Sequence, residues 1–395
     1  MIGISKLYCG TVESSDALRY GRSSEAMPSH LLQFSKDKRP VVVWNVTRGC
    51  NLKCIHCYAH ATQNKEVDEL STEQGKHLLD DLADFGVPVV LFSGGEPLVR
   101  KDLPDLAEYA VSKGMRAVIS TNGTLIKKDT AKRLKDIGLS YVGISLDGTE
   151  SVNDYFRGVQ GAFKAAMKGV ENCQNVGIKV GFRFTINELN AKEIPAIFNI
   201  VEKMDVPRIC FYHLVYAGRG SKLREQDLSH EETRRVVDYI MDRTKQLHEQ
   251  GKSKEVLTVD NHADGPYVYL RLLKEDPERA KDVLELLKMN EGNNSGRGIG
   301  CVSWNGDVHA DQFWRHKFFG NVKQVPFSQL WTDNPDPLLN QLKEKKKHVK
   351  GRCAKCQWLE ICGGNFRVRA EAVTGDIWAP DPACYLTDSE IKIDT

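Results

Sequence analysis

Short apolar runs alternate with amphipathic segments through the first half of the chain. The runs cover residues 41–46, 89–92, 117–120, 141–146, 179–185 and 209–215. The segments between them place apolar residues on one helical face, and the clearest follows a capping box at Ser71 and Gln74 and ends at Gly86. Strands that alternate with helices in this way require a parallel sheet with right-handed crossovers. The pattern therefore predicts the α/β fold class.

The number of strand–helix units limits how far this sheet can close. A complete barrel of this kind has eight units, whereas the pattern indicates six within residues 37–225. We therefore expect a curved, open (β/α)6 partial barrel with one lateral mouth.

The rest of the chain divides into three further segments. Residues 1–36 have no clean period and are interpreted as an extension that packs on the barrel. Residues 226–295 are polar and periodic, which predicts a helical bridge. The turn-rich stretch 292–296 marks a boundary, and residues 296–395 are expected to form a small α+β domain.

Two local features of that last domain carry expectations. Asn305 and Gly306 separate two apolar runs, and this dipeptide favours the type I′ turn of a β-hairpin. The run Lys345, Lys346 and Lys347 is interpreted as a solvated face.

Charge and hydropathy exclude some classes of protein. The formal net charge of the 395 residues is +2, which argues against nucleic acid as the main partner. No apolar run approaches the roughly 18 residues that a membrane helix needs, and the first residues lack the layout of a signal peptide. We expect a cytoplasmic protein that binds neither nucleic acid nor membrane.

The eleven cysteines fall into two clusters and four scattered residues. In a reducing compartment, clustered cysteines indicate a metal site rather than disulfides. Three thiolates with no fourth nearby can hold three irons of a 4Fe–4S cube and leave the fourth iron open, whereas four complete its coordination. A tetrathiolate zinc site also fits the second spacing. The first cluster is Cys50, Cys54 and Cys57, and the second is Cys353, Cys356, Cys362 and Cys384.

Motifs that can carry chemistry follow four successive predicted strands. The first cysteine cluster follows the run 41–46, and residues 94–96, 121–123 and 147–148 follow the next three runs. Because ligands of parallel α/β folds sit at the carboxyl ends of the strands, one mouth should collect all four motifs.

The spacing Cys50-x3-Cys54-x2-Cys57, with Gly-Gly-Glu at 94–96 after the next strand, resembles the radical S-adenosylmethionine (SAM) superfamily. The resemblance implies that SAM chelates the open iron through its amino and carboxylate groups. Reductive cleavage of SAM then gives a 5′-deoxyadenosyl radical that abstracts hydrogen from the substrate. His56 is interpreted as a ring packed against the cluster rather than a fourth ligand.

The same resemblance implies a set of SAM-binding residues. Gly94 and Gly95 would let the backbone approach the ligand closely, and Glu96 would offer its carboxylate to the SAM ammonium group. Hydrogen bonds to the ribose or carboxylate, and a contact with the SAM carboxylate, are expected from Asn122, Ser145 and Arg157.

The spacing of the second cysteine cluster resembles the auxiliary-cluster part of the SPASM or twitch-like domain found behind many radical SAM barrels. That resemblance implies an auxiliary 4Fe–4S cluster. The chain lacks the further cysteines of the full SPASM pattern, because Phe366 stands four positions after Cys362 and residues 308–311 contain no cysteine. We therefore predict two clusters in total, with Cys301 as an alternative auxiliary ligand.

Residues 40–48, 58–61 and 362–370, with Arg157-Gly158 and residues 218–220, resemble the tetrapyrrole-modifying branch of the superfamily. The likeness is greatest to the didecarboxysirohaem deacetylase family of the alternative haem pathway. This implies an iron tetrapyrrole substrate that loses two acetate side chains to give iron coproporphyrin III, and a low-potential electron donor such as ferredoxin or flavodoxin.

Three alternatives stay open at this point. The related haem d1 biosynthesis enzyme acts on the same substrate but removes propionate side chains. A peptide-modifying SPASM enzyme would accept a peptide at the mouth. A non-enzymatic protein could use both cysteine clusters to bind structural zinc.

The substrate would be recognised through its carboxylates, which favour the bidentate fork of arginine. His213 and His309 are candidate iron ligands or proton donors, and Arg219 is a further catalytic candidate. The remaining candidates are aromatic rings for stacking and arginines for carboxylates: Trp304, Trp314, Trp331, Arg183, Arg367 and Arg369.

Overall fold

The computed structural model describes residues 1–13, 16, 19, 39–64 and 68–392. Within these ranges the strands form one sheet in the order β1-β8-β7-β6-β5-β4-β3-β2-β9-β10. The strands are β1 (Ile2–Gly3), β2 (Val41–Thr47), β3 (Val89–Gly94), β4 (Arg116–Thr121), β5 (Tyr141–Ser145), β6 (Val180–Ile186), β7 (Arg208–His213), β8 (Glu255–Val259), β9 (Ile299–Val302) and β10 (Val308–His309).

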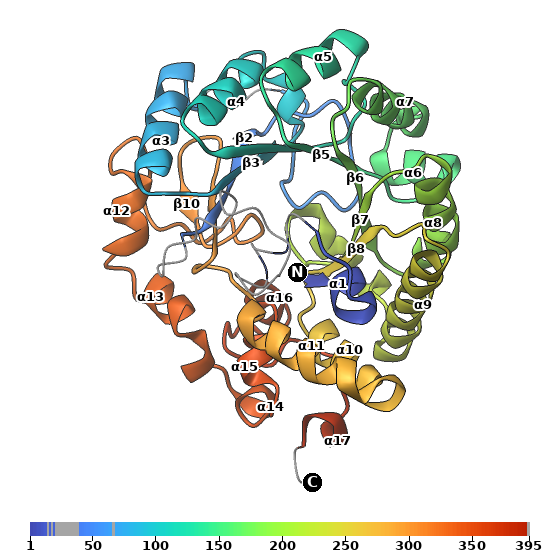
Figure 1. The fold of residues 1–395 in the computed structure, drawn as a ribbon. Helices are drawn as coiled ribbons and strands as arrows, with labels where there is room; N and C mark the ends of the chain where they lie inside the picture. The colour runs from blue at the N-terminus through green and yellow to red at the C-terminus, as the bar shows by residue number, and fades with distance from the viewer. Residues whose placement is uncertain (14–15, 17–18, 20–38, 65–67, 393–395) are drawn as a thin grey trace.

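The six predicted strands are confirmed as β2 to β7, which pair in parallel in chain order. The sheet is curved, and helices line its outer side (Figure 1). The predicted capping box is also present, since the Ser71 side chain accepts from the Gln74 N–H and the Gln74 side chain accepts from the Ser71 N–H. These outer helices are α3 (Thr72–Asp84), α4 (Leu103–Ser112), α5 (Lys128–Asp136), α6 (Glu150–Arg157), α7 (Ala162–Asn175) and α8 (Ile194–Lys203).

The segment 226–295 is not the wholly helical bridge that its polarity predicts. Between α9 (His230–Glu249) and α10 (Asp264–Glu275) the chain forms β8, a seventh parallel strand that pairs with β7. All five residues of β8 are buried. A run this short between long polar helices has too few positions for its period to stand out. A further helix, α11 (Pro277–Asn290), completes the segment.

The start of the chain is part of the same sheet. Strand β1 pairs antiparallel with β8, with Ile2 opposite Thr258. Helix α1 (Ile4–Cys9) follows at once and buries Ile4 and Leu7 completely. Most of the predicted extension after residue 13 lies outside the described residues.

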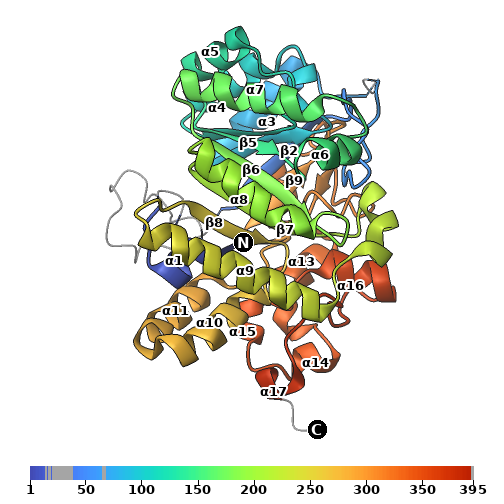
Figure 2. The ribbon, with the colours of Figure 1, turned by 90° about the vertical axis from the view of Figure 1, so that its right-hand side faces the viewer.

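The predicted β-hairpin is confirmed as β9 and β10, but its turn is not the expected type I′ turn, because Gly306 adopts a positive φ of 96° whereas Asn305 does not adopt a positive φ. Strand β9 also pairs in parallel with β2, so the sheet continues across the predicted boundary at residue 296. Beyond it the chain is mainly helical (Figure 2). The helices are α12 (Phe327–Thr332), α13 (Pro337–Lys343), α14 (Gly351–Ala354), α15 (Leu359–Cys362), α16 (Arg367–Thr374) and α17 (Asp388–Ile391).

The expected solvated lysine run is wrong at one position. Lys345 is 4% exposed, and its Nζ donates to Asn293 Oδ1 at 2.9 Å. Three consecutive residues of a tight helical turn point in different directions, so the run cannot present all three side chains to solvent. Burial lowers the pKa of Lys345 to about 7. Among the described helices, none is long and apolar enough to cross a bilayer.

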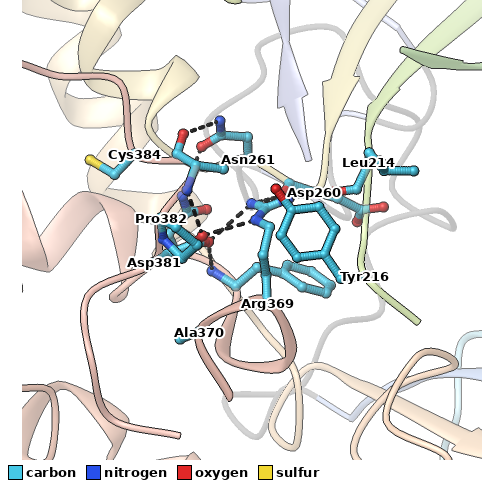
Figure 3. A network of polar contacts seen from close by, with 12 residues as sticks. Leu214, Tyr216, Asp260, Asn261, Arg369, Ala370, Asp381, Pro382 and Cys384 are labelled. Carbon is cyan, nitrogen blue, oxygen red and sulfur yellow. Dashed lines mark hydrogen bonds and ion pairs between the residues drawn. The ribbon is translucent and has the colours of Figure 1, made fainter. Parts of the chain in front are cut away.

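One buried guanidinium joins the C-terminal segment to the sheet (Figure 3). Arg369 on α16 donates to both carboxylate oxygens of Asp381, at 2.8 and 3.0 Å. It also donates to the carbonyls of Leu214 and Asp260, each at 2.8 Å. These two residues directly follow β7 and β8, and Asp381 lies three residues before Cys384. Arg369 therefore sets the position of that cysteine against two strand ends.

Replacing Asp381 tests how much this connection stabilises the fold. The Asp381→Asn variant leaves the Arg369 cation buried without its carboxylate, which typically costs about 3–5 kcal/mol. Denaturant unfolding should show that loss in the free energy of unfolding. The control is Asp282→Asn, which removes an exposed carboxylate 3.8 Å from Arg279 and should cost less than about 1 kcal/mol. Equal losses in the two variants would contradict the assigned role.

Candidate active site

Residues from seven strand ends meet around one cavity. Three of the four predicted motifs contribute lining residues, whereas Asp147 of the fourth contacts the lining residues Arg157 and His56. Cys50, Cys54 and Cys57 lie in the loop after β2 and line this cavity. The remaining strands contribute lining residues at or just past their carboxyl ends, including Ser93, Gly94, Gly95, Thr121, Asn122, Ser145, Arg183, Thr185, Tyr212, His213 and Asp260.

Each of the three thiols accepts a hydrogen bond from a protein N–H group. The Leu52 N–H donates to Cys50 Sγ at 3.3 Å, and the Ala61 N–H donates to Cys57 Sγ at 3.4 Å. Arg157 Nη1 lies 3.6 Å from Cys54 Sγ. Burial raises the pKa of Cys50 to about 12, so the free thiol stays protonated, and metal binding must release that proton. The donor set fits an iron–sulfur cluster held by three thiolates.

Glycines from other elements hold the cysteine loop through backbone contacts. A Cβ atom on Gly95 would lie 2.2 Å from the Gly49 carbonyl oxygen, and one on Gly94 would lie 2.4 Å from that of Thr47. Gly218 has a φ of 56°, and a Cβ atom on it would lie 2.4 Å from the Tyr58 carbonyl oxygen. The sequence predicted that Gly94 and Gly95 allow a close approach to a ligand. The structure adds that both glycines are required for the close approach to the loop itself.

Arg219 lines the cavity and also supports the cysteine loop. Its Nε donates to the Cys54 carbonyl at 2.7 Å and its Nη1 to the Ala61 carbonyl at 2.9 Å. The two hydrogen bonds connect Cys54, the middle cysteine of the loop, with Ala61, which follows the last cysteine of the loop. These contacts give Arg219 a role in holding the loop, and its predicted catalytic role stays a prediction.

The contacts of Glu96 differ from the expectation that its carboxylate binds the SAM ammonium group. Its side chain is fully buried, and its two oxygens accept from Thr121 Oγ1, the Asn122 N–H and the Leu98 N–H at 2.7, 2.7 and 3.1 Å. Because these protein donors occupy the carboxylate, Glu96 positions the ends of β3 and β4. A motif match shows which residue type is needed, but not whether it faces ligand or protein.

Arg157 has a protein carboxylate as its partner. Its Nη2 lies 2.5 Å from Asp147 Oδ2, and His56 Nε2 lies 3.3 Å from the same oxygen. Burial alone would raise the pKa of Asp147, but Arg157 and His56 hold it below its usual value. The His56 ring packs edge-on against Phe156, at 5.5 Å between centroids, in line with the packed-ring interpretation.

The two candidate histidines differ in position. His213 lines the cavity, and its Nε2 donates to Asp264 Oδ2 at 2.9 Å. His309 does not line it: Nδ1 donates to the Lys317 carbonyl at 2.7 Å and Nε2 contacts Ser303 Oγ at 2.9 Å. Both ring nitrogens of His309 are therefore engaged by protein, which removes it as an iron ligand or proton donor.

The other substrate candidates are mostly structural. Arg367 and Arg369 are buried and donate to backbone carbonyls or to Asp381. Trp304 packs under the Arg315 guanidinium at 4.3 Å. Trp314 is fully buried, and Trp331 stacks on Phe327. Other protein groups therefore cover the tryptophan rings that were expected to contact a macrocycle.

The second cysteine cluster gathers around α14 and α15. Burial raises the pKa of Cys362 well above its usual value, and the nearby thiols of Cys384, Cys353 and Cys356 raise it further. Within the described ranges, no group of three or more His, Cys, Asp or Glu side chains is placed to hold a single metal ion. Cys301 lies apart on β9, where its sulfur accepts from Asn45 Nδ2 at 3.4 Å.

Asp260 was missed because nothing in its sequence context marks it. It follows the unpredicted strand β8, adopts a φ of 67° and is 7% exposed at the cavity wall. Burial raises the pKa of Asp260 from 3.8 to about 7. A buried acid of this kind at a cavity is a candidate for a functional group.

The pKa of Asp260 predicts a pH dependence of stability. Between about pH 4 and pH 7 the folded protein keeps a proton that the unfolded chain loses, so the free energy of unfolding falls as the pH rises through this window. Asp260→Asn removes this titration, and asparagine tolerates the positive φ. Denaturant unfolding should therefore show that the variant gains stability over the natural protein at pH 8 but not at pH 4. Parallel pH curves for the two proteins would contradict this expectation.

Comparison with known proteins places this geometry in a family. Residues 44–201 match the model of the radical SAM superfamily. Among solved structures, SuiB of Streptococcus suis bound to precursor peptide SuiA superposes with a TM-score of 0.70 over 88% of this chain and 76% of its own, at 19% identity. A likeness at this identity shows the fold alone.

Two relatives are similar over most of their length. The chain is 45% identical to the pre-heme d1 synthase of Dinoroseobacter shibae over 356 residues, which is 89% of this chain and 87% of that one. It is 68% identical to the Fe-coproporphyrin III synthase of Methanosarcina barkeri over 394 residues, or 99% of each chain. The chain therefore belongs to the radical SAM superfamily and, within it, to the family that includes Fe-coproporphyrin III synthase.

Proposed function

We propose that the protein removes the two acetate side chains of didecarboxysirohaem to give iron coproporphyrin III. The observation that carries the proposal is the 68% identity to Fe-coproporphyrin III synthase over 99% of both chains. The similarity spans the cavity, the loop and the C-terminal cysteines together. The superfamily makes the protein an enzyme that uses a 4Fe–4S cluster and SAM.

The cavity supplies the residues that this chemistry needs. Cys50, Cys54 and Cys57 would hold three irons and leave the fourth iron for SAM. When bound, the cluster and SAM together supply a 5′-deoxyadenosyl radical. The SAM side of the cavity would be formed by Gly94, Gly95, Asn122 and Ser145, with Glu96 acting through Thr121 and Asn122.

The second cysteine cluster would hold the auxiliary 4Fe–4S cluster. Its position supports an electron-transfer role, because a chain of hydrogen bonds leads from the cavity towards it. His213 donates to Asp264, whose other oxygen accepts from the Tyr385 hydroxyl at 2.7 Å. Tyr385 directly follows Cys384. A ferredoxin or flavodoxin would deliver the low-potential electron.

The haem d1 reaction is the second candidate, supported by the 45% identity to pre-heme d1 synthase. It would remove propionate rather than acetate side chains from the same tetrapyrrole. Both candidates predict the same cofactors and the same cavity, so the mass of the product separates them.

Anaerobic turnover with didecarboxysirohaem, SAM and a reductant tests the proposal. We expect 5′-deoxyadenosine and a tetrapyrrole lighter by two acetate groups, as measured by mass spectrometry. A product lighter by two propionate groups would establish the haem d1 reaction instead. An unchanged tetrapyrrole in the presence of SAM cleavage would reject both.

Paired cysteine variants test the assignment of the two clusters. Cys54→Ala should remove one cluster and abolish SAM cleavage, because it removes a ligand of the open-iron cluster. Cys356→Ala should lower the iron content from roughly eight to about four per chain while SAM binding persists. Iron analysis and SAM titration check this, and loss of SAM binding in Cys356→Ala would contradict the division of roles.

A further inference from the structure

We infer that Arg183 binds a side-chain carboxylate of the substrate inside the cavity. The inference rests on the proposed function, because the substrate class comes from it. It adds a specific subsite on β6, where Arg183 lines the same cavity as Gly94 and Gly95 and pairs in register with Ser145 of β5.

The first argument compares the cations that line the cavity. Arg157 and His56 share Asp147, His213 is paired with Asp264, and Arg219 donates to backbone carbonyls. In the described part of the chain, Arg183 is the lining cation whose guanidinium has neither a hydrogen-bond acceptor nor an ion-pair partner. The lining acid Asp260 interacts electrostatically with Arg183 but makes no ion pair with it, and burial raises the pKa of Asp260 to about 7. A partly buried cation without a paired carboxylate is costly, so a ligand anion at this position would be stabilised.

The second argument is that the guanidinium is held ready for such an anion. Its central carbon lies 4.8 Å from the centre of the Tyr212 ring on β7. On the other side, a Cβ atom on Gly143 of β5 would lie 3.0 Å from Arg183 Cδ, so the glycine leaves room for the arginine stem. The ring and the glycine restrict the side chain before any ligand arrives, which reduces the entropy lost on binding.

The third argument is chemical. A planar guanidinium presents two parallel N–H groups that match a carboxylate, and it can do so while stacked on a ring. A tetrapyrrole with acetate and propionate side chains offers several carboxylates, whereas SAM offers one. The larger number of carboxylates favours the tetrapyrrole as the source, although Ser145 on the SAM side of the cavity pairs in register with Arg183. An experiment must still separate the two carboxylates.

The test compares Arg183→Gln, Arg183→Lys and a control in the protein with both clusters present. The control is Arg208→Gln, which also removes a guanidinium stacked on a tyrosine, Tyr141 at 5.0 Å, but at the first residue of β7, beside Glu255 and outside the cavity lining. The probes are iron coproporphyrin III, its methyl ester and SAM, and the readouts are the tetrapyrrole Kd from the Soret band and the SAM Kd.

We expect Arg183→Gln to weaken iron coproporphyrin III binding about tenfold to a hundredfold, as for loss of a charge-assisted bidentate contact. The affinity of Arg183→Lys for iron coproporphyrin III should lie between those of the natural protein and Arg183→Gln, because lysine keeps the positive charge but lacks the two parallel N–H groups. The methyl ester should bind the natural protein and Arg183→Gln equally, because it has no carboxylate for the guanidinium. Arg208→Gln should leave the tetrapyrrole Kd unchanged, and an unchanged SAM Kd in Arg183→Gln shows that the cavity is intact.

Three results would overturn the inference, and they differ from one another. A weakened SAM Kd with an unchanged tetrapyrrole Kd would assign Arg183 to the SAM carboxylate. Unchanged values for both ligands would remove any role for Arg183 in anion binding. Failure of the natural protein to bind iron coproporphyrin III or didecarboxysirohaem at all would reject the proposed function, and this inference with it.

Discussion

The close backbone contact between the cysteine loop and the neighbouring strand ends is the constraint on which the site depends. Three thiols can share one cluster only if the loop between them is held in one conformation. Gly94, Gly95 and Gly218 allow other elements to reach the loop carbonyls where any side chain would collide. Arg219 then donates to two further carbonyls of the loop, those of Cys54 and Ala61. The loop is therefore positioned by its contacts with the folded sheet.

Ion pairs and hydrogen bonds within the protein distinguish the cavity residues that have a structural role from those that are available to a ligand. Asp147 pairs with Arg157, Asp264 is hydrogen-bonded to His213, and the buried Glu96 accepts from three protein donors. Such groups hold the walls in place, because breaking a buried pair leaves an uncompensated charge. Among the described lining residues, Arg183 and Asp260 stand outside this pattern, and the charge of Arg183 acts on the pKa of Asp260 without an ion pair between them.

The two cysteine clusters belong to one connected structure. Strand β9 hydrogen-bonds to β2, and Arg369 ties the segment before Cys384 to the ends of β7 and β8. A fold of this class serves different substrates, as the peptide-bound SuiB shows beside the tetrapyrrole enzymes. The activity must therefore be argued from the cavity residues and the near full-length identity, not from the fold.

Local pattern by itself determined the six central strands, the hairpin and the cysteine motif, because hydrophobic period, turn chemistry and ligand spacing are properties of neighbouring residues. It could not determine β8, whose five residues are recognisable as a strand only when they pair with β7. The sequence was equally unable to show the bonding partners of several polar side chains. Folding brings these partners together from elsewhere in the chain or loop for Glu96, Arg219, His309 and Lys345. Whether a polar side chain meets protein or ligand is decided by tertiary packing, since only packing places its partner within bonding distance.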